Sequence, residues 1–261
     1  MQYTTHGIQI YVGYSFDLVG KFTAASVAMQ QKLGRPLLWN ACRHHVGEVI
    51  LTWVWNSLEV EVAKSPEISV FQRYRDNYSK LSYRDLSDLQ PLDIEEELKP
   101  AVQEVVQLIA HTLGKKEFGY RGDYTQFMKL VLVALTGDTS SFHFTRPGAL
   151  SKARWMGKCN YAIPMVLMKT KIANELGRET VIMTKKQLGL LERFVKFICV
   201  VYAKWWITCP LPAECGLADL QLLEAIRSYP DKTIATAAEK ALHLHLWYLT
   251  PEQTPRCLFS S

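Results

Sequence analysis

The sequence lacks a long apolar run and a recognisable targeting segment. Its longest apolar stretch without a charge runs from Phe197 to Ala203, between Lys196 and Lys204, whereas a membrane-spanning helix needs about 20 residues. The first residues, Met1 to His6, contain no basic region followed by an apolar one, so we expect no secretory signal. We therefore expect an intracellular protein whose six cysteines are thiols rather than disulfides.

The sequence also lacks internal repeats and strong compositional bias. Glycine (14 residues) and proline (11 residues) occur at close to their average frequencies, which argues against a disordered or fibrous chain. With 48% hydrophobic residues, a chain of 261 residues is long enough to bury at least one core. We expect a globular protein of one large domain or two small ones.

The chain has a net charge of +5, but its positive charge is unevenly distributed along the sequence. Between Arg146 and Lys204, twelve Lys and Arg residues stand against three acidic ones, Glu175, Glu179 and Glu192, so the remainder of the chain is net acidic. A concentrated positive field attracts a phosphate backbone, but a solvated helix surface gives the same count. Charge alone leaves both interpretations open.

The first forty residues predict a strand, a helix and a second strand. Ile8 to Phe16 alternates apolar and polar residues, which is typical of a strand, here ending at Asp17. Apolar residues then recur at helical spacing up to Gly34, where glycine followed by Pro36 is expected to stop the helix. Leu37 to Ala41 predicts a second strand, and the short crossover favours parallel pairing with the first.

Helices are predicted for most of the remaining chain. The helix from His45 to Leu58 is expected to bury one stripe of five residues, Val46, Val49, Ile50, Trp53 and Val54. Residues 79–97 are rich in Ser, Asp and Pro and predict an irregular connector. Six further helices are predicted over Leu98–Leu113, Asp123–Leu135, Leu150–Ile172, Lys185–Ile207, Ala218–Ser228 and Asp231–Tyr248. Pro164 should kink or split the third of these.

Several polar residues stand where they could carry chemistry. Asp17 lies at the carboxyl end of a predicted strand, where α/β sheets present functional groups, although an aspartate there also serves as a turn or helix-capping residue. Cys42 and His45 have the spacing of two zinc ligands, but a closed structural site needs four, and the later Cys and His residues are too scattered to complete it. Packing or helix capping is the alternative for this pair.

The basic segment contains a candidate nucleic-acid contact at the start of a predicted helix. Trp155 could stack on an unpaired base while Arg154, with Lys152 or Lys158, holds phosphates. The alternative is that Trp155 belongs to the core with Arg154 extending beside it.

Three acidic residues near predicted helix starts have a simpler default role. Glu252 follows Thr250 and Pro251 in the order expected of a helix N-terminus, so it would complement the helix dipole. Glu214 and Asp219 flank a loop-to-helix transition and have the same default role.

Taken together, these positions resemble DNA transposases with a ribonuclease-H-like (DDE-type) catalytic domain, and their order looks most like the hAT type. Four features stand in the family's order: Asp17, Cys42 with His45, Arg154 with Trp155, and Glu252. The chain also resembles transposon-encoded proteins of invertebrate genomes through the segments LGRPLLWNACRHHVGEVIL, ARWMGKCNYAI, VYAKWWITCPLPAE and HLWYLTPE.

The resemblance implies a mostly α-helical fold with a small α/β part. Residues 1–78 would form a partial ribonuclease-H-like unit of strand, helix, strand and helix, and residues 79–97 a connector. Residues 98–261 would then form a large helical insertion with a returning C-terminal helix. The implied partners are DNA and a second copy of the chain, with no membrane, in the nucleus.

The resemblance also implies an incomplete catalytic site. Such domains hold two divalent metal ions with three carboxylates, and only Asp17 and Glu252 (or Glu214 in place of Glu252) have counterparts in this chain. We expect the first of the three carboxylates, an aspartate, to belong to an earlier strand. Mg²⁺ or Mn²⁺ would be needed only if the chain were an active enzyme. Three functions follow: a non-cleaving transposase-derived protein that binds DNA or a partner, part of an active nuclease, or a helical interaction scaffold without nucleic acid.

Overall fold

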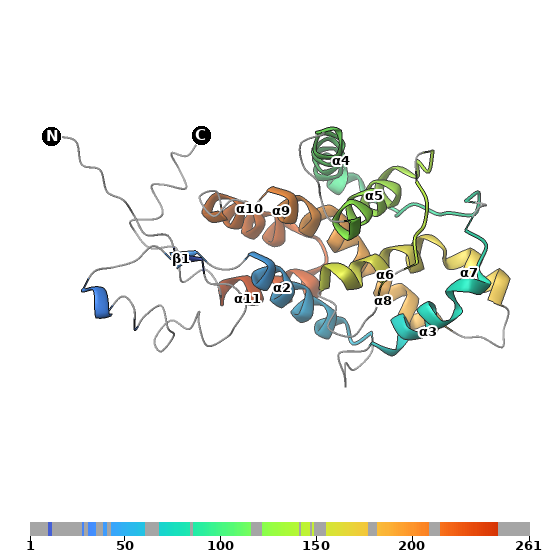
Figure 1. The fold of residues 1–261 in the computed structure, drawn as a ribbon, viewed down its shortest axis with the longest axis horizontal. Helices are drawn as coiled ribbons and strands as arrows, with labels where there is room; N and C mark the ends of the chain where they lie inside the picture. Colours follow the sequence, from blue (N-terminus) through green and yellow to red (C-terminus); the bar gives the residue numbers. More distant parts are fainter. Residues whose placement is uncertain are drawn as a thin grey trace.

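The computed structural model describes residues 10–11, 28, 31–34, 39–40, 43–60, 68–83, 86–115, 122–140, 142–146, 148, 155–176, 182–208 and 215–244. This part of the chain is mostly α-helical (Figure 1). The helices are α2 (Arg43–Leu58), α3 (Ser69–Asn77), η2 (Tyr78–Lys80), η3 (Glu96–Leu98), α4 (Lys99–Gly114), α5 (Gly122–Thr136), α6 (Trp155–Leu167), α7 (Lys169–Leu176), α8 (Lys185–Phe197), η4 (Ile198–Tyr202), α9 (Ala203–Thr208), α10 (Cys215–Ser228) and α11 (Lys232–His243).

Two short strands lie near the start of the chain. β1 (Ile10–Tyr11) and β2 (Trp39–Asn40) pair in parallel, with Ile10 opposite Trp39. Gly34, between them, has a φ of 62°, the left-handed conformation expected at the end of a helix. The pairing has the predicted direction but covers two residues on each side. A ribonuclease-H-like core therefore stays a prediction.

The core is assembled from helices that precede and follow the connector. α11 packs along α2, and α2 also contacts α6 and α8 (Figure 1). α8, η4 and α9 form one continuous helical run, and all five residues of η4 are buried. η4 is a π-helical turn, in which an extra residue widens the helix and changes the direction of the side chains beyond it.

Most of the predicted helices are present with nearly the predicted bounds. The helix expected over Leu150–Ile172 is divided at Met168 into α6 and α7, four residues beyond Pro164. Pro164 itself stays within α6, where the missing amide removes one bond of the helical ladder. The division agrees with the expected split, but the break is displaced toward the C-terminus.

The connector over residues 79–97 runs along the helices that follow it. Its described part contains the short turns η2 and η3 and no longer helix. The amide of Leu92 donates to the carbonyl of Ala134 at 2.8 Å, and the amide of Gln90 donates to that of Leu167 at 3.2 Å. These bonds satisfy backbone groups of an irregular segment and hold it against α5 and α6.

A glycine permits the close approach of α2 to the run through η4 and α9. A Cβ added to Gly47 would lie 2.8 Å from the Tyr202 hydroxyl oxygen and 3.1 Å from Cζ3 of Trp205. Both rings are buried, so neither has free space beside it. Gly47 therefore sets how closely the two helices pack.

The predicted buried stripe of α2 is wrong at Trp53, and Val49 on the same stripe is only partly buried. Val46, Ile50 and Val54 are fully buried, but Trp53 is 40% exposed, and Trp55 is the tryptophan inside the core. The ring of Trp55 lies 5.3 Å from that of Phe71. α2 is packed against α11, α6 and α8, so more than one of its faces is buried. Trp55 lies on a buried face, while Trp53 lies at the edge of the contact with α11. A single-stripe prediction cannot describe such a helix.

No helix in the described part of the chain is both long and apolar enough to span a membrane.

Candidate functional site

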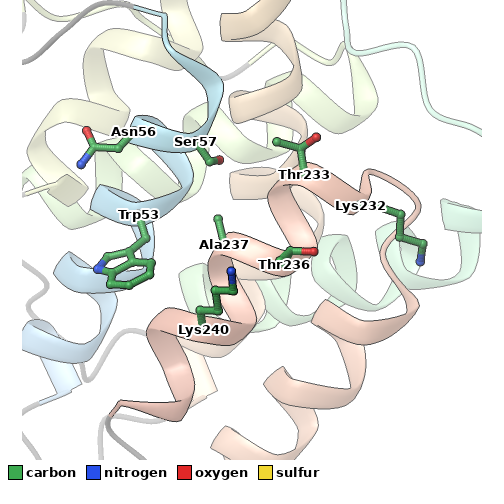
Figure 2. Close-up of a pocket in the computed structure, with 8 residues that line it drawn as sticks. All are labelled: Trp53, Asn56, Ser57, Lys232, Thr233, Thr236, Ala237 and Lys240. Carbon is green, nitrogen blue, oxygen red and sulfur yellow. The ribbon is translucent and has the colours of Figure 1, made fainter.

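A groove of about 720 Å³ runs between α2 and α11 (Figure 2). Three side chains of α2 line it, Trp53, Asn56 and Ser57, together with five of α11, Lys232, Thr233, Thr236, Ala237 and Lys240. The helices run in opposite directions, so Trp53 lies toward the Lys240 end and Ser57 toward the Thr233 end (Figure 2). The groove thus presents an indole ring, the ammonium group of Lys240 and several hydroxyl and amide groups, with Lys232 at its other end.

The sequence of α11 places polar groups along the groove by helical periodicity. Lys232, Thr236 and Lys240 are spaced by four residues and lie on one exposed stripe. The opposite stripe is buried and consists of Ile234, Ala235, Ala238, Ala241 and Leu242. The alanines on this stripe let α11 pack closely, and Lys240 lies over the contact between the two helices, whereas the Lys232 side chain extends away from α2 (Figure 2).

The first turn of α11 is held by a carboxylate with two functions. Asp231 is the N-cap of the helix and accepts hydrogen bonds from the backbone amides of Thr233 and Ile234. It also accepts two hydrogen bonds from Arg193 of α8, from Nε at 2.7 Å and from Nη2 at 3.0 Å. The end of the groove formed by the first turn of α11 is therefore held against α8 by charge-assisted hydrogen bonds.

Lys232 and Lys240 differ in their surroundings from the ion-paired cations of the basic segment. Lys232 Nζ donates to the backbone carbonyl of Tyr229 at 3.2 Å. Within the described residues, no carboxylate forms an ion pair with either lysine. The acidic residue of α11 beside Lys240, Glu239, is paired instead with Arg227 at 2.7 Å and contacts His243. The groove consequently keeps two positive charges that described carboxylates do not neutralise.

The basic segment between Arg146 and Lys204 is partly neutralised where the structure describes it. Five of its cations form ion pairs: Lys169 with Glu192, Lys171 with Glu175, Arg193 with Asp231, Lys196 with Glu95 and Lys204 with Glu104. Three of the five carboxylates lie outside the segment, on the connector, α4 and the α11 cap. The charge excess counted along the sequence is therefore reduced in three dimensions.

Most of the site residues expected from the sequence cannot be placed. Asp17, Cys42, Lys152, Arg154, Glu214 and Glu252 lie outside the residues that the structure describes. His45 belongs to α2 and Trp155 begins α6, but their side chains are not among those described. The expected catalytic pair and the stacking role of Trp155 therefore stay predictions.

Lys158, the remaining expected DNA contact, is half-buried on α6. Burial lowers the pKa of Lys158 below its ordinary value, while the nearby Glu48 carboxylate on α2 opposes this shift. Lys158 faces the contact between α6 and α2 and does not line the groove between α2 and α11.

Asp219 has a different environment from the one expected. It lies inside α10 rather than at its start, is fully buried, and accepts a hydrogen bond from the indole Nε1 of Trp205 at 2.8 Å. The default role at a helix start is therefore wrong for Asp219, because α10 begins earlier, at Cys215. Its carboxylate is a buried polar link between α10 and α9.

No group of three or more His, Cys, Asp or Glu side chains in the described part of the chain is placed to hold a metal ion. Cys159 and Cys199 are buried free thiols, and burial raises the pKa of each. Asp17 and Glu252, the expected Mg²⁺ or Mn²⁺ ligands, lie beyond the described ranges.

Sequence reasoning missed the groove, because it requires two helices that are distant in the chain. Each half carries a local signal: a tryptophan with polar residues three and four positions later on α2, and lysines eight positions apart on one stripe of α11. Neither signal shows that the two faces meet.

Searches against protein-family models, curated proteins and solved structures find no match to this chain.

Proposed function

We propose that this chain is a transposase-derived protein that binds DNA without cleaving it, and that it does so through the groove between α2 and α11. The observation that carries the proposal is an exposed indole, Trp53, beside the ammonium group of Lys240, with a second lysine, Lys232, at the other end of the same groove (Figure 2). Trp53 is a large aromatic side chain that remains 40% exposed although most aromatic rings of the described chain are buried.

The groove combines the two interactions by which proteins hold nucleic acid without reading its sequence. Ammonium groups neutralise phosphates and release counterions, and aromatic rings stack on bases. Lys232 and Lys240 supply the first interaction and Trp53 the second. Asn56 and Thr236 add groups that can hydrogen bond with sugar or base edges.

The resemblance to ribonuclease-H-like transposases supports DNA as the ligand and argues against cleavage. The sequence provides counterparts for two carboxylates, Asp17 and Glu252, whereas two-metal catalysis in that family uses three. The ion pairs of the basic segment favour the scaffold function for that surface. Its paired lysines contact carboxylates of the same chain rather than a ligand. The groove is the surface that distinguishes a DNA-binding protein from a scaffold.

The proposal is tested by fluorescence anisotropy with labelled DNA, comparing the wild-type chain with the double variant Lys232→Gln/Lys240→Gln. Each lost phosphate contact removes about one counterion from the salt dependence, so the double variant should bind more weakly and with a shallower salt slope. The matched control is Lys185→Gln/Lys186→Gln, which removes two exposed lysines at the start of α8, outside the groove.

The control variant should bind almost as the wild type does. Equal loss of affinity in both double variants would mean that net charge alone attracts DNA, and the groove would not be the binding site. Absence of measurable DNA binding at low salt would favour the scaffold function instead.

A further inference from the structure

We infer that the ligand of the groove is a single strand of nucleic acid several nucleotides long, rather than an intact duplex or a mononucleotide. The inference rests on the proposed function and specifies its ligand. It follows from three features of the groove: the accessible ring, the spacing of the two lysines and the character of the polar lining.

The position of Trp53 favours an unpaired base. Its ring lies at the wall of the groove, beside the Lys240 end of α11 (Figure 2). In a duplex both faces of each internal base are already covered by neighbouring base pairs, so stacking on Trp53 would first require unstacking, which costs a few kcal/mol. A single strand offers its bases without this cost and can place one of them against the indole.

The spacing of the lysines sets a minimum length for the ligand. Lys232 and Lys240 are eight residues apart on one face of α11, which corresponds to about 12 Å along the helix axis. A ligand that spans this distance can place different phosphates against the two lysines, which a mononucleotide with a single phosphate cannot do. An oligonucleotide lying along α11 can reach both lysines while one of its bases stacks on Trp53.

The remaining lining groups are suited to a ligand of variable base sequence. The amide of Asn56 and the hydroxyls of Thr233 and Thr236 are each both donor and acceptor, so they can adapt to different base edges or to sugar oxygens. The Ser57 hydroxyl donates to the carbonyl of Val54 at 2.8 Å and remains available as an acceptor. We therefore expect little sequence preference.

The test compares binding of the wild type, Trp53→Ala and Trp53→Phe to four labelled probes. These are a mixed-sequence single-stranded DNA of about ten nucleotides, the same strand as RNA, its blunt DNA duplex and a mononucleotide. DNA and RNA strands share the phosphates and bases that the groove would contact, so both are included. Trp53 is a surface residue, so thermal melting should confirm that both variants fold.

We expect at least one single strand to bind more tightly than the duplex, and the mononucleotide to bind most weakly. Trp53→Ala should weaken single-strand binding by about 5- to 100-fold, the range for loss of one base stack, and leave duplex binding nearly unchanged. Trp53→Phe should retain most of the affinity.

Two results would overturn the inference in different ways. Duplex binding that equals or exceeds single-strand binding, with no effect of Trp53→Ala, would end the single-strand inference but leave DNA binding intact. Failure to bind any of the polynucleotide probes would end both the inference and the proposed function.

Discussion

Arg193 of α8 and Asp231 at the start of α11 form a two-point ion pair, with Nε and Nη2 of the guanidinium both donating to the carboxylate. The same carboxylate caps α11. The pair therefore couples the position of α8 to that of the groove-lining helix. Two consequences can be measured, one for stability and one for its dependence on pH.

The stability contributed by Asp231 should decline in acid. Burial by itself raises the pKa of this carboxyl, but the hydrogen bonds from Arg193 and from the first amides of α11 outweigh it and hold the pKa below its ordinary value of 3.8. A lowered pKa in the folded state stabilises the fold above the unfolded-state pKa, and this contribution is lost as the pH falls through the folded-state pKa. The affected range is therefore below about pH 4.

Urea unfolding of the wild type and Asp231→Asn from pH 7 to pH 3 measures this contribution. The Asn variant retains the helix cap but loses the charge, so its free energy of unfolding should be lower by about 0.5 to 1 kcal/mol at pH 7. The difference should shrink below about pH 4. A difference that stays constant down to pH 3 would show that Asp231 carries no charge-dependent stabilisation.

Truncation of the two tryptophans of α2 should lower the stability by very different amounts. Trp55→Ala empties a fully buried site between Phe71 and Phe194 and should lower the free energy of unfolding by about 3 to 5 kcal/mol. Trp53→Ala removes a ring that is 40% exposed and should cost less than about 1.5 kcal/mol. Denaturant melts of both variants decide this, and a larger loss for Trp53 would place that ring in the core.

Two glycines in helices offer a matched pair of substitutions. Gly47→Ala should lower the free energy of unfolding by about 1 to 3 kcal/mol, because its methyl would lie 2.8 Å from the Tyr202 hydroxyl. The neighbouring Trp205 ring is fixed by its bond to Asp219 and cannot easily move aside. Gly189→Ala on α8 meets no atom within 4 Å and should stabilise by about 0.5 to 1 kcal/mol. Equal effects of the two substitutions would contradict the close packing of α2.

Metal-dependent cleavage of DNA is not expected. Under the proposed function, Asp17 and Glu252 would correspond to two of the three carboxylates of ribonuclease-H-like transposases, and two-metal catalysis requires both ions to be held against the scissile phosphate. The assay incubates the purified chain with hairpin and nicked duplexes in Mg²⁺ or Mn²⁺. Cleavage that disappears in Asp17→Asn and Glu252→Gln would instead support the active-nuclease function.

Most helices in the described part of the chain were accessible from the sequence because their periodicity is local, but α3 was not predicted. The predicted helix from Lys185 to Ile207 corresponds to the continuous run of α8, η4 and α9, and the Asp231 cap stands where the last helix was expected to begin. The π-helical turn in η4 has no comparable local signal, since it depends on how the surrounding helices pack.

The candidate site was not accessible in the same way. Whether Trp53 or Trp55 enters the core depends on which neighbours surround α2, and these lie far along the chain. Two of the ion pairs of the basic segment likewise join residues about a hundred positions apart, Lys196 with Glu95 and Lys204 with Glu104. Counting charges along the sequence therefore overstated the free positive charge of that segment. The lysines of α11 became candidate ligand contacts only because the structure places α11 beside α2.

The most direct test of groove binding is the indole region of a ¹H–¹⁵N correlation spectrum recorded while a single-stranded oligonucleotide is added. Trp53→Phe assigns the Trp53 signal by its disappearance. We predict that this signal shifts with saturation, because the ring lines the groove, while the signal of the buried, Asp219-bonded Trp205 stays in place. An unmoved Trp53 signal under conditions in which the oligonucleotide binds would contradict groove binding, and a shift confined to Trp155 would move the site to the start of α6.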